Sequence, residues 1–444
     1  MQTALFPHNY AEVIGQMTLA FQFAFWACIG AIVYNYVGYP FVLYLLGALV
    51  QAKSDFEFLI AGENRRRPQQ ASYKPSVAVL VAAFNEEVVI EGRIRNLLEI
   101  SYPSDLIEIL IGLDSPTDST SLILSQFRST RVRVFKFPKR RGKLAVLRDL
   151  AQQTSAEILL LTDAETMFAP DCVQKLVQHF ADPAVGAVGG QLRVLDRDGN
   201  VPVEGVYWRY ELLLKSLESK LNCVVGMVGS LYAVRSALFH AQRPSFAEDF
   251  QLPMQIRVSG RRVIYEPAAL AVETATPTFA AEFRRRIRLG AADYQILTHN
   301  FGFFNPLNGF VTFSYVSHKV LRWLGPFLLL TVLISNLCLI SKPIYCGLLL
   351  VQSGLYAMAS LGFLLATNGK SHKFLAIPFY FFSMNLALLC GFFRFLTGRQ
   401  SMAWDPTVRT FESVSASRPQ AYSAISDFTR GNRTATSETP GSEL

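Results

Sequence analysis

Two carboxylates stand one residue apart in the stretch EILLLTDAETMFAPD, at Asp163 and Glu165, directly after a run of apolar residues. Like charges at this spacing repel each other unless a cation neutralises them. Carboxylate oxygens suit Mg²⁺ and Mn²⁺, which are commonly bound together with the phosphates of a substrate. The pattern therefore indicates a divalent metal site that holds a phosphorylated ligand.

Polar side chains also follow two earlier apolar runs. Asn85 and Glu86 follow SVAVLVAAF, and Asp114 and Asp118 follow IEILIGL. Asp and Asn at such points commonly begin the next helix or turn, so a capping role stays open for Asn85 and Asp118. The other interpretation is that these groups gather at one ligand site.

The elements that would position these residues alternate regularly. Apolar runs beginning at Ser76 and Glu157, together with residues 107–114 and 131–137, predict strands, and residues 88–100, 119–127 and 143–153 predict helices. Strands that are apolar throughout and separated by helices indicate an α/β fold, with a mostly parallel sheet and helices on both faces. Ligands of such sheets bind beyond the carboxyl ends of the strands, where the polar residues stand.

The composition indicates a membrane protein, because 51% of the 444 residues are hydrophobic and only 17% are charged. Residues 318–340, 343–366 and 374–396 are each long and apolar enough to span a bilayer, and residues 16–50 predict one N-terminal anchor. The net charge of +8 suits nucleic acid, anionic lipid or phosphorylated substrates. Since the sequence has no recognisable nucleic-acid-binding module, we expect no nucleic acid as a partner.

Four regions follow from these patterns. We expect a membrane anchor at 1–50, a soluble domain at 51–300, an interfacial segment with three transmembrane helices at 301–400, and a disordered tail at 401–444 that is rich in Ser, Thr, Pro and Gly. Basic runs at 65–67, 139–141 and 284–288 predict that the soluble domain is cytoplasmic. The side of the C-terminal tail stays open, because three spans would leave it outside whereas nearby arginines favour the inside.

The motifs AAFNEE, DSPTD, GK, DAE, AEDF and RRRIR occur in this order between about residues 73 and 295. Together they resemble the membrane-bound family 2 glycosyltransferases, which include cellulose, chitin and hyaluronan synthases and bacterial exopolysaccharide enzymes. The resemblance implies a nucleotide-sugar-binding, glycosyltransferase A-like fold in a multi-pass protein of the inner (cytoplasmic) membrane. It also implies inverting, Mg²⁺- or Mn²⁺-dependent sugar transfer from a nucleotide sugar to a saccharide or lipid-linked acceptor.

The resemblance also implies roles for individual residues. Asp163 and Glu165 would hold the metal against the donor diphosphate, and Asp249 of the Glu248–Asp249 pair would be the general base. Without the resemblance, that pair could equally be the acidic start of a helix. The implied donor-binding residues are Asn85, Glu86, Asp114, Lys143, Asp163, Arg285 and Arg288.

The implied acceptor site is less complete. It would include Gly229, Tyr232 and Leu289, although the residue type of Tyr232 favours core packing. Processive members of the family carry QxxRW where this chain has Arg285 to Leu289, so Leu289 replaces an aromatic residue. This leaves polymerisation and a single transfer to a polyprenyl phosphate both open. A third alternative is a catalytically silent scaffold among polysaccharide export partners.

Overall fold

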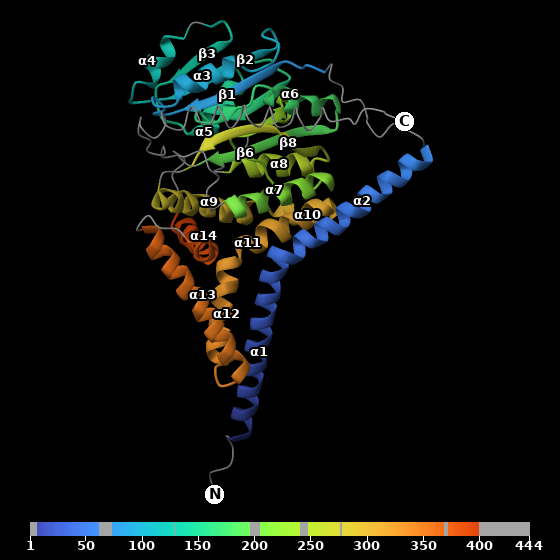
Figure 1. The fold of residues 1–444 in the computed structure, drawn as a ribbon, viewed down its shortest axis with the longest axis vertical. Helices are drawn as coiled ribbons and strands as arrows, with labels where there is room; N and C mark the ends of the chain where they lie inside the picture. The colour runs from blue at the N-terminus through green and yellow to red at the C-terminus, as the bar shows by residue number, and fades with distance from the viewer. Residues whose placement is uncertain are drawn as a thin grey trace, which may run out of the picture. The chain divides into compact units, whose positions relative to one another are not determined.

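The computed structural model describes residues 7–61, 73–127, 129–195, 205–239, 247–275, 278–367 and 372–398 (Figure 1). The chain divides into two compact units. The sheet unit comprises the described residues within 47–281 and 307–311, and the helical unit comprises the described residues within 1–46, 282–306 and 312–400. The tail predicted at 401–444 lies outside the described residues.

One sheet forms the centre of the sheet unit. Its described strands are β1 (Val77–Ala83), β2 (Ile107–Asp114), β3 (Val132–Phe137), β4 (Ile158–Thr162), β5 (Met167–Phe168), β6 (Val185–Leu195), β7 (Leu231–Arg235) and β8 (Arg262–Thr274). They are arranged in the order β3-β2-β1-β4-β7-β6-β8-β5. The pairs β1–β2, β1–β4, β2–β3 and β6–β8 are parallel, whereas β7 is antiparallel to β4 and β6, and β5 to β8.

Helices cover both faces of this sheet because its strands carry apolar residues on both sides. They are α3 (Ile90–Leu98), α4 (Thr120–Ser125), α5 (Lys143–Ala151), α6 (Cys172–Val177), α7 (Gly205–Lys220) and α8 (Glu248–Val258), with the short 3₁₀ turns η2 (Gln178–Ala181) and η3 (Ser236–Leu238). Every residue of β1 is buried. In contrast, β3 at the sheet edge is only partly covered.

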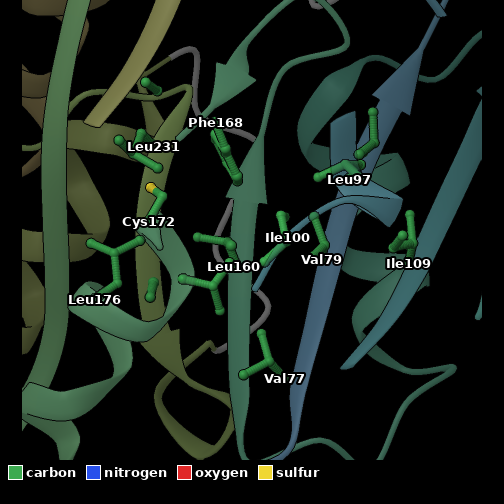
Figure 2. Close-up of a cluster of buried hydrophobic side chains, with 14 of the residues drawn as sticks. Val77, Val79, Leu97, Ile100, Ile109, Leu160, Phe168, Cys172, Leu176 and Leu231 are labelled. Carbon is green, nitrogen blue, oxygen red and sulfur yellow. The ribbon is translucent and has the colours of Figure 1, made fainter. Parts of the chain in front are cut away.

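Alternate residues of the strands separate two hydrophobic clusters. On one face, odd-numbered residues of β1 such as Val77 and Val79 pack with α3, α4 and α6 (Figure 2). On the other face, even-numbered residues such as Leu80 pack with apolar residues of α5 and α8. The first residues of α5 and α8 are Lys143 and Glu248, so the second face carries two of the predicted site residues at its helix starts.

The helical unit is built mainly from helices. Its elements are α1 (Pro7–Val33), the π-helix η1 (Tyr34–Gly38), the start of α2 (Tyr39–Ala61), most of α9 (Phe279–His299), η4 (Phe301–Phe304), the first residue of η5 (Pro306–Asn308), the last three residues of α10 (Phe310–Ser314), the π-helix η6 (Tyr315–Val320), α11 (Leu321–Trp323), α12 (Gly325–Cys338), α13 (Pro343–Thr367) and α14 (Lys373–Leu396). The backbones of α9 and α14 are in close contact. A Cβ built on Gly391 of α14 would lie 2.9 Å from Ile287 O of α9.

Three described helical stretches are long and apolar enough to cross a membrane: Glu12–Ile60, Pro343–Ala366 and Phe374–Leu396. The stretch predicted as a further span, 318–340, is not one straight helix. It is divided between Phe310–Trp323 and Gly325–Cys338, which meet at 57° and could together form a fourth span. Pro326 near the start of α12 lacks the N–H that would continue the preceding helix, which explains the break.

Polar side chains join the N-terminal helices to the segment before α12. The Asn35 side-chain amide donates to Ser317 O at 2.5 Å, and Tyr34 and Ser317 share a hydrogen bond between their hydroxyls at 2.9 Å. Both pairs link the two π-helices, η1 and η6. Trp26 likewise donates to the Tyr345 hydroxyl at 3.1 Å. These hydrogen bonds satisfy polar groups inside an otherwise apolar helix cluster.

Candidate functional site

The carboxyl ends of β1 and β2 carry residues in an unusual backbone conformation. Asn85 has φ of 54° and Ser115 has φ of 58°, a region that non-glycine residues seldom adopt. The Asn85 side chain joins the two loops, because its Oδ1 accepts from Thr117 N at 2.8 Å and its Nδ2 donates to Thr117 Oγ1 at 3.1 Å. Asn85 therefore does not cap the helix that follows it.

Glu86 and Asp118 fix the same pair of loops. Glu86 N donates to Thr120 Oγ1 at 2.8 Å, and Glu87 N donates to Asp118 Oδ2 at 3.0 Å. Asp118 Oδ1 also accepts from Thr120 N at 3.0 Å, at the start of α4. Asp118 is therefore a turn residue before α4, one of the two structural alternatives for it, whereas the N-cap of this helix is Ser119. The predicted donor-binding role of Asn85 and Glu86 stays a prediction.

Asp114, the last residue of β2, holds the basic loop that precedes α5. Its fully buried carboxylate accepts from Arg141 N at 2.7 Å and from Gly142 N at 2.9 Å. Gly142 has φ of 88°, which only glycine adopts without strain. Asp114 thereby places Lys143 at the first turn of α5. Its predicted donor-binding role stays a prediction.

Lys143 joins two acidic residues that lie far apart in the sequence. Its Nζ lies 2.7 Å from Asp163 Oδ1 and 3.2 Å from Glu248 Oε1, and it donates to Gly229 O at 3.3 Å. Burial lowers the pKa of Lys143, but the charges of Asp163 and Glu248 outweigh it and raise this pKa well above its ordinary value. The ammonium is thus held protonated at the carboxyl edge of the sheet, between β4 and α8.

Asp249 lies beside Glu248 in the first turn of α8, against a glycine-containing turn. Met227 N donates to Asp249 O at 2.8 Å. A Cβ built on Gly229 would lie 3.2 Å from Asp249 Oδ2, which is a tight contact. The absence of a side chain at Gly229 therefore leaves room for the carboxylate of Asp249. Glu248 and Asp249 form the acidic start of α8, which the sequence had left open as an alternative. Glu248 also pairs with Lys143.

The environment of Asp249 favours a carboxylate that can accept a proton near neutral pH. Burial and the charge of Glu248 raise the pKa of Asp249 from its ordinary value of 3.8 to about 6, against the opposing charges of Lys143 and Lys215. A general base works best when its pKa lies near the working pH. Asp249 has the electrostatic properties that this role requires.

The described residues fit a divalent metal only together with oxygens from a ligand. Among them, no group of three or more His, Cys, Asp and Glu side chains could hold a metal. Asp163 is 37% exposed and Glu165 is partly buried, both in the turn between β4 and β5. Two such carboxylates suit Mg²⁺ or Mn²⁺ when substrate phosphates complete the coordination. The cation that neutralises Asp163 in this structure is Lys143.

Tyr232 is fully buried in β7, between β4 and β6. Its ring belongs to the hydrophobic cluster under α5 and α8, so the packing role left open by the sequence is confirmed. Burial first, and then the charge of Glu248, raise the pKa of Tyr232 well above its ordinary value, while Lys143 lowers it. The residue therefore packs the core directly beside the charged groups.

The remaining predicted residues lie on α9, in the helical unit. Arg285 is exposed and lies 3.4 Å from Glu282 Oε1, and Arg288 and Leu289 are partly buried. Glu282 is buried and also pairs with Arg286 at 2.7 Å. The predicted contacts of Arg285 and Arg288 with a diphosphate, and of Leu289 with an acceptor, stay predictions.

Two features of this site were missed by the sequence analysis. The link from Lys143 to Glu248 spans 105 positions, and no pattern in the sequence pairs them. Lys215 on α7, whose charge lowers the pKa of Asp249, also carried no signal beyond its helical context. Both depend on the order of the strands, which brings α5, α7 and α8 to one part of the sheet unit.

Comparison with known proteins identifies the family. The model of Glycosyl transferase family 2 matches residues 78–236, and that of Glycosyl transferase family group 2 matches residues 158–393, more than half of the chain. An N-acetylglucosaminyltransferase from Rhizobium leguminosarum bv. viciae is 25% identical over 240 residues, which cover 50% of this chain and 56% of the relative. A poly-beta-1,6-N-acetyl-D-glucosamine synthase from Staphylococcus aureus (strain COL) is 23% identical over 236 residues, covering 51% and 56%. The match spans just over half the length of these relatives.

A solved structure supports the fold. A mannosyltransferase from Pyrobaculum calidifontis, in complex with GDP-Man and Mn²⁺, aligns with a TM-score of 0.62 and 20% identity, covering 87% of this chain and 99% of that chain. This similarity confirms the predicted glycosyltransferase A-like fold. With the match over 158–393, it also confirms the resemblance read from the motifs: the chain belongs to Glycosyl transferase family group 2.

Proposed function

We propose that this chain transfers a sugar from a nucleotide sugar to a saccharide or lipid-linked acceptor, with inversion at the anomeric carbon, in exopolysaccharide synthesis. One observation carries this proposal. Asp249, with a pKa raised to about 6, lies next to the Glu248 that Lys143 joins to Asp163 at the carboxyl edge of the sheet. The names of the relatives, an N-acetylglucosaminyltransferase and a poly-N-acetylglucosamine synthase, support a saccharide product.

Sugar transfer with inversion requires a base at the acceptor hydroxyl and positive charge at the departing diphosphate. A hydroxyl oxygen of the acceptor forms a bond to the anomeric carbon, while the bond from that carbon to the diphosphate breaks and its electron pair leaves with the diphosphate. Asp249 accepts the hydroxyl proton. Lys143 supplies a positive charge on the diphosphate side, where negative charge develops.

Asp163 and Glu165 would hold Mg²⁺ or Mn²⁺. When bound, the metal would stabilise the negative charge of the departing diphosphate. The Mn²⁺ that accompanies GDP-Man in the similar mannosyltransferase structure supports dependence on a divalent ion. Asp114 contributes indirectly, because it holds the loop that orients Lys143.

The motifs imply further donor- and acceptor-binding residues on α9. Arg285 and Arg288 offer planar guanidinium groups that suit a diphosphate. Leu289 stands where processive relatives carry an aromatic residue, and this observation favours a second candidate function, a single transfer to a polyprenyl phosphate. The length of the product distinguishes the two functions.

The apolar helices support a location in the inner (cytoplasmic) membrane. Three described stretches are long enough to span a bilayer, and the basic runs favour a catalytic domain on the cytoplasmic side. The expected partners are the nucleotide sugar, the acceptor, the lipid bilayer and proteins of polysaccharide export.

Turnover by the purified protein in detergent tests the proposal. A panel of nucleotide sugars is offered with Mn²⁺, Mg²⁺ or EDTA, and release of nucleoside diphosphate is measured together with product length. We expect one or a few donors to be consumed only when a divalent ion is present. No consumption of any donor, with and without a saccharide acceptor, would favour the silent scaffold.

A further inference from the structure

The hydroxyl of Tyr232 is polar, fully buried and without a hydrogen-bond partner among the described residues. A buried hydroxyl without a partner lowers stability, because it has lost its hydrogen bonds to water. Phe would fill the same space without this cost. The presence of this hydroxyl is explained if it forms a hydrogen bond in another state of the protein.

The position of Tyr232 indicates which groups that other state could offer. On β7, its side chain lies on the sheet face covered by α5 and α8. These helices begin with Lys143 and Glu248, which are joined at 3.2 Å. Glu248 exerts the strongest charge effect on Tyr232, followed by Lys143 and Asp249. The hydroxyl therefore lies within electrostatic range of both members of the Lys143–Glu248 pair.

We propose that Tyr232 is a positioning residue whose hydroxyl donates a hydrogen bond to Glu248 when the nucleotide sugar draws Lys143 away. This role rests on the proposed function. In the present structure one ammonium serves both Asp163 and Glu248. A donor diphosphate at the same edge presents oxygen atoms with high negative charge, which compete for that ammonium.

Departure of Lys143 would leave Glu248 in an unfavourable state. Its side chain is only 12% exposed, and a buried carboxylate without a partner is strongly destabilising. Tyr232 supplies a donor from within the core, so no water has to enter. Because Glu248 and Asp249 are neighbours in the first turn of α8, a fixed Glu248 also keeps the base in place.

The test compares two Tyr-to-Phe variants that should behave in opposite ways. Tyr232→Phe removes a hydroxyl without a partner. Tyr102→Phe is the matched control, because Tyr102 is buried and its hydroxyl donates to Pro75 O, just before the start of β1, at 2.7 Å. For each protein we measure Tm alone, the Tm shift caused by Mn²⁺ with UDP or with GDP, and kcat and KM for the donor.

We expect Tyr232→Phe to have a Tm equal to or above that of the wild type, a smaller Tm shift with Mn²⁺ and nucleotide, and a kcat about tenfold lower, as for one lost hydrogen bond. Tyr102→Phe should have a lower Tm, with unchanged kcat and an unchanged nucleotide-induced shift. The double variant Tyr232→Phe, Glu248→Gln should lose no more kcat than Glu248→Gln alone, since Tyr232 acts through Glu248.

A Tyr232→Phe protein with wild-type kcat and a wild-type nucleotide-induced shift would overturn this role and leave Tyr232 as core packing. Additive losses of kcat in the double variant would also overturn it. These outcomes leave the proposed function intact, provided that the wild type consumes a nucleotide sugar. A wild type that neither binds nucleotide nor consumes any donor would overturn the proposed function and this role together.

Discussion

The ammonium of Lys143 lies 2.7 Å from the carboxylate of Asp163, although 20 positions separate the two residues in the chain. The first turn of α5 and the end of β4 come together because α5 packs against β1 and β2, and β4 pairs with β1. The repulsion expected around Asp163 is thus relieved by a side chain of the protein itself. This pairing makes Lys143 both a structural cation and a candidate ligand for the donor diphosphate.

Replacing Lys143 with Met should destabilise the protein more at neutral than at acidic pH. The change leaves Asp163 and Glu248 without their shared cation, and loss of one partner of a partly buried pair costs about 1 to 3 kcal/mol. Protonation of the carboxylates at low pH reduces this cost. Thermal unfolding at pH 8 and pH 5 measures the difference between variant and wild type.

Lys53→Met is the control for this experiment. Lys53 lies 3.7 Å from Glu57 within α2, and the two side chains are 77% and 65% exposed. Such an exposed pair contributes little, so we expect a small change in Tm at both pH values. Equal losses for Lys143→Met and Lys53→Met would contradict a special role for the Lys143 pairing.

Gly229→Ala should reduce activity with only a small loss of stability. The added Cβ would lie 3.2 Å from Asp249 Oδ2 and 3.3 Å from Asp249 Cγ, so the carboxylate has to move by a few tenths of an ångström. Small displacements of a catalytic group can lower the rate by about a hundredfold. Gly302→Ala, whose Cβ would meet nothing within 4 Å, is the matched control and should keep wild-type kcat.

The pH dependence of kcat/KM should show the ionisation of Asp249. Its pKa is raised to about 6, and only the ionised form accepts a proton. Below pH 6 the rate constant should therefore fall about tenfold per pH unit, and above it should level off. A profile that stays flat down to pH 4.5 would be incompatible with Asp249 as the base.

The same shift predicts how Asp249→Asn changes stability. Because the folded-state pKa lies above the ordinary value of 3.8, ionisation of Asp249 opposes folding, and this penalty develops as the pH rises from about 4 to 6. Asp249→Asn removes it, by up to about 3 kcal/mol. The variant should have a higher Tm than the wild type at pH 8 and a similar Tm at pH 4.

Much of the fold could be predicted from the sequence because the strands of the first half are apolar throughout. The run IEILIGLD predicted β2 with its correct limits, and SVAVLVAA predicted β1. The antiparallel insertion of β7 between β4 and β6 could not be predicted, since β7 pairs with β4 across about 70 positions and with β6 across about 45. The break before α12 was also missed, because a hydropathy profile shows how long an apolar stretch is but not whether its helix bends.

The site could be predicted where its residues lie close together in the sequence, as in Asp163 with Glu165 or Glu248 with Asp249. It was not predictable where it depends on contacts across the sheet. Asp114 illustrates the limit: its residue type indicated a polar ligand contact, whereas its carboxylate accepts two backbone N–H groups of the loop before α5. Residue type predicts the chemistry of a side chain, whereas the order of the strands determines which groups it contacts.

Loss of both proposed metal ligands should abolish the dependence on a divalent ion. In the double variant Asp163→Asn, Glu165→Gln, we expect turnover to fall to the level that the wild type shows in EDTA. Titration with Mn²⁺, followed by electron paramagnetic resonance in the presence of UDP or GDP, measures binding independently of activity. Unchanged Mn²⁺ binding in this variant would place the metal elsewhere.

The most direct test of the account is sugar transfer by Asp249→Asn, measured alongside nucleotide binding by the same protein. The account predicts that kcat falls by about 10² to 10⁴, while the affinity for the nucleoside diphosphate with Mn²⁺ stays within a few fold of the wild type. A variant that transfers sugar at the wild-type rate would contradict it.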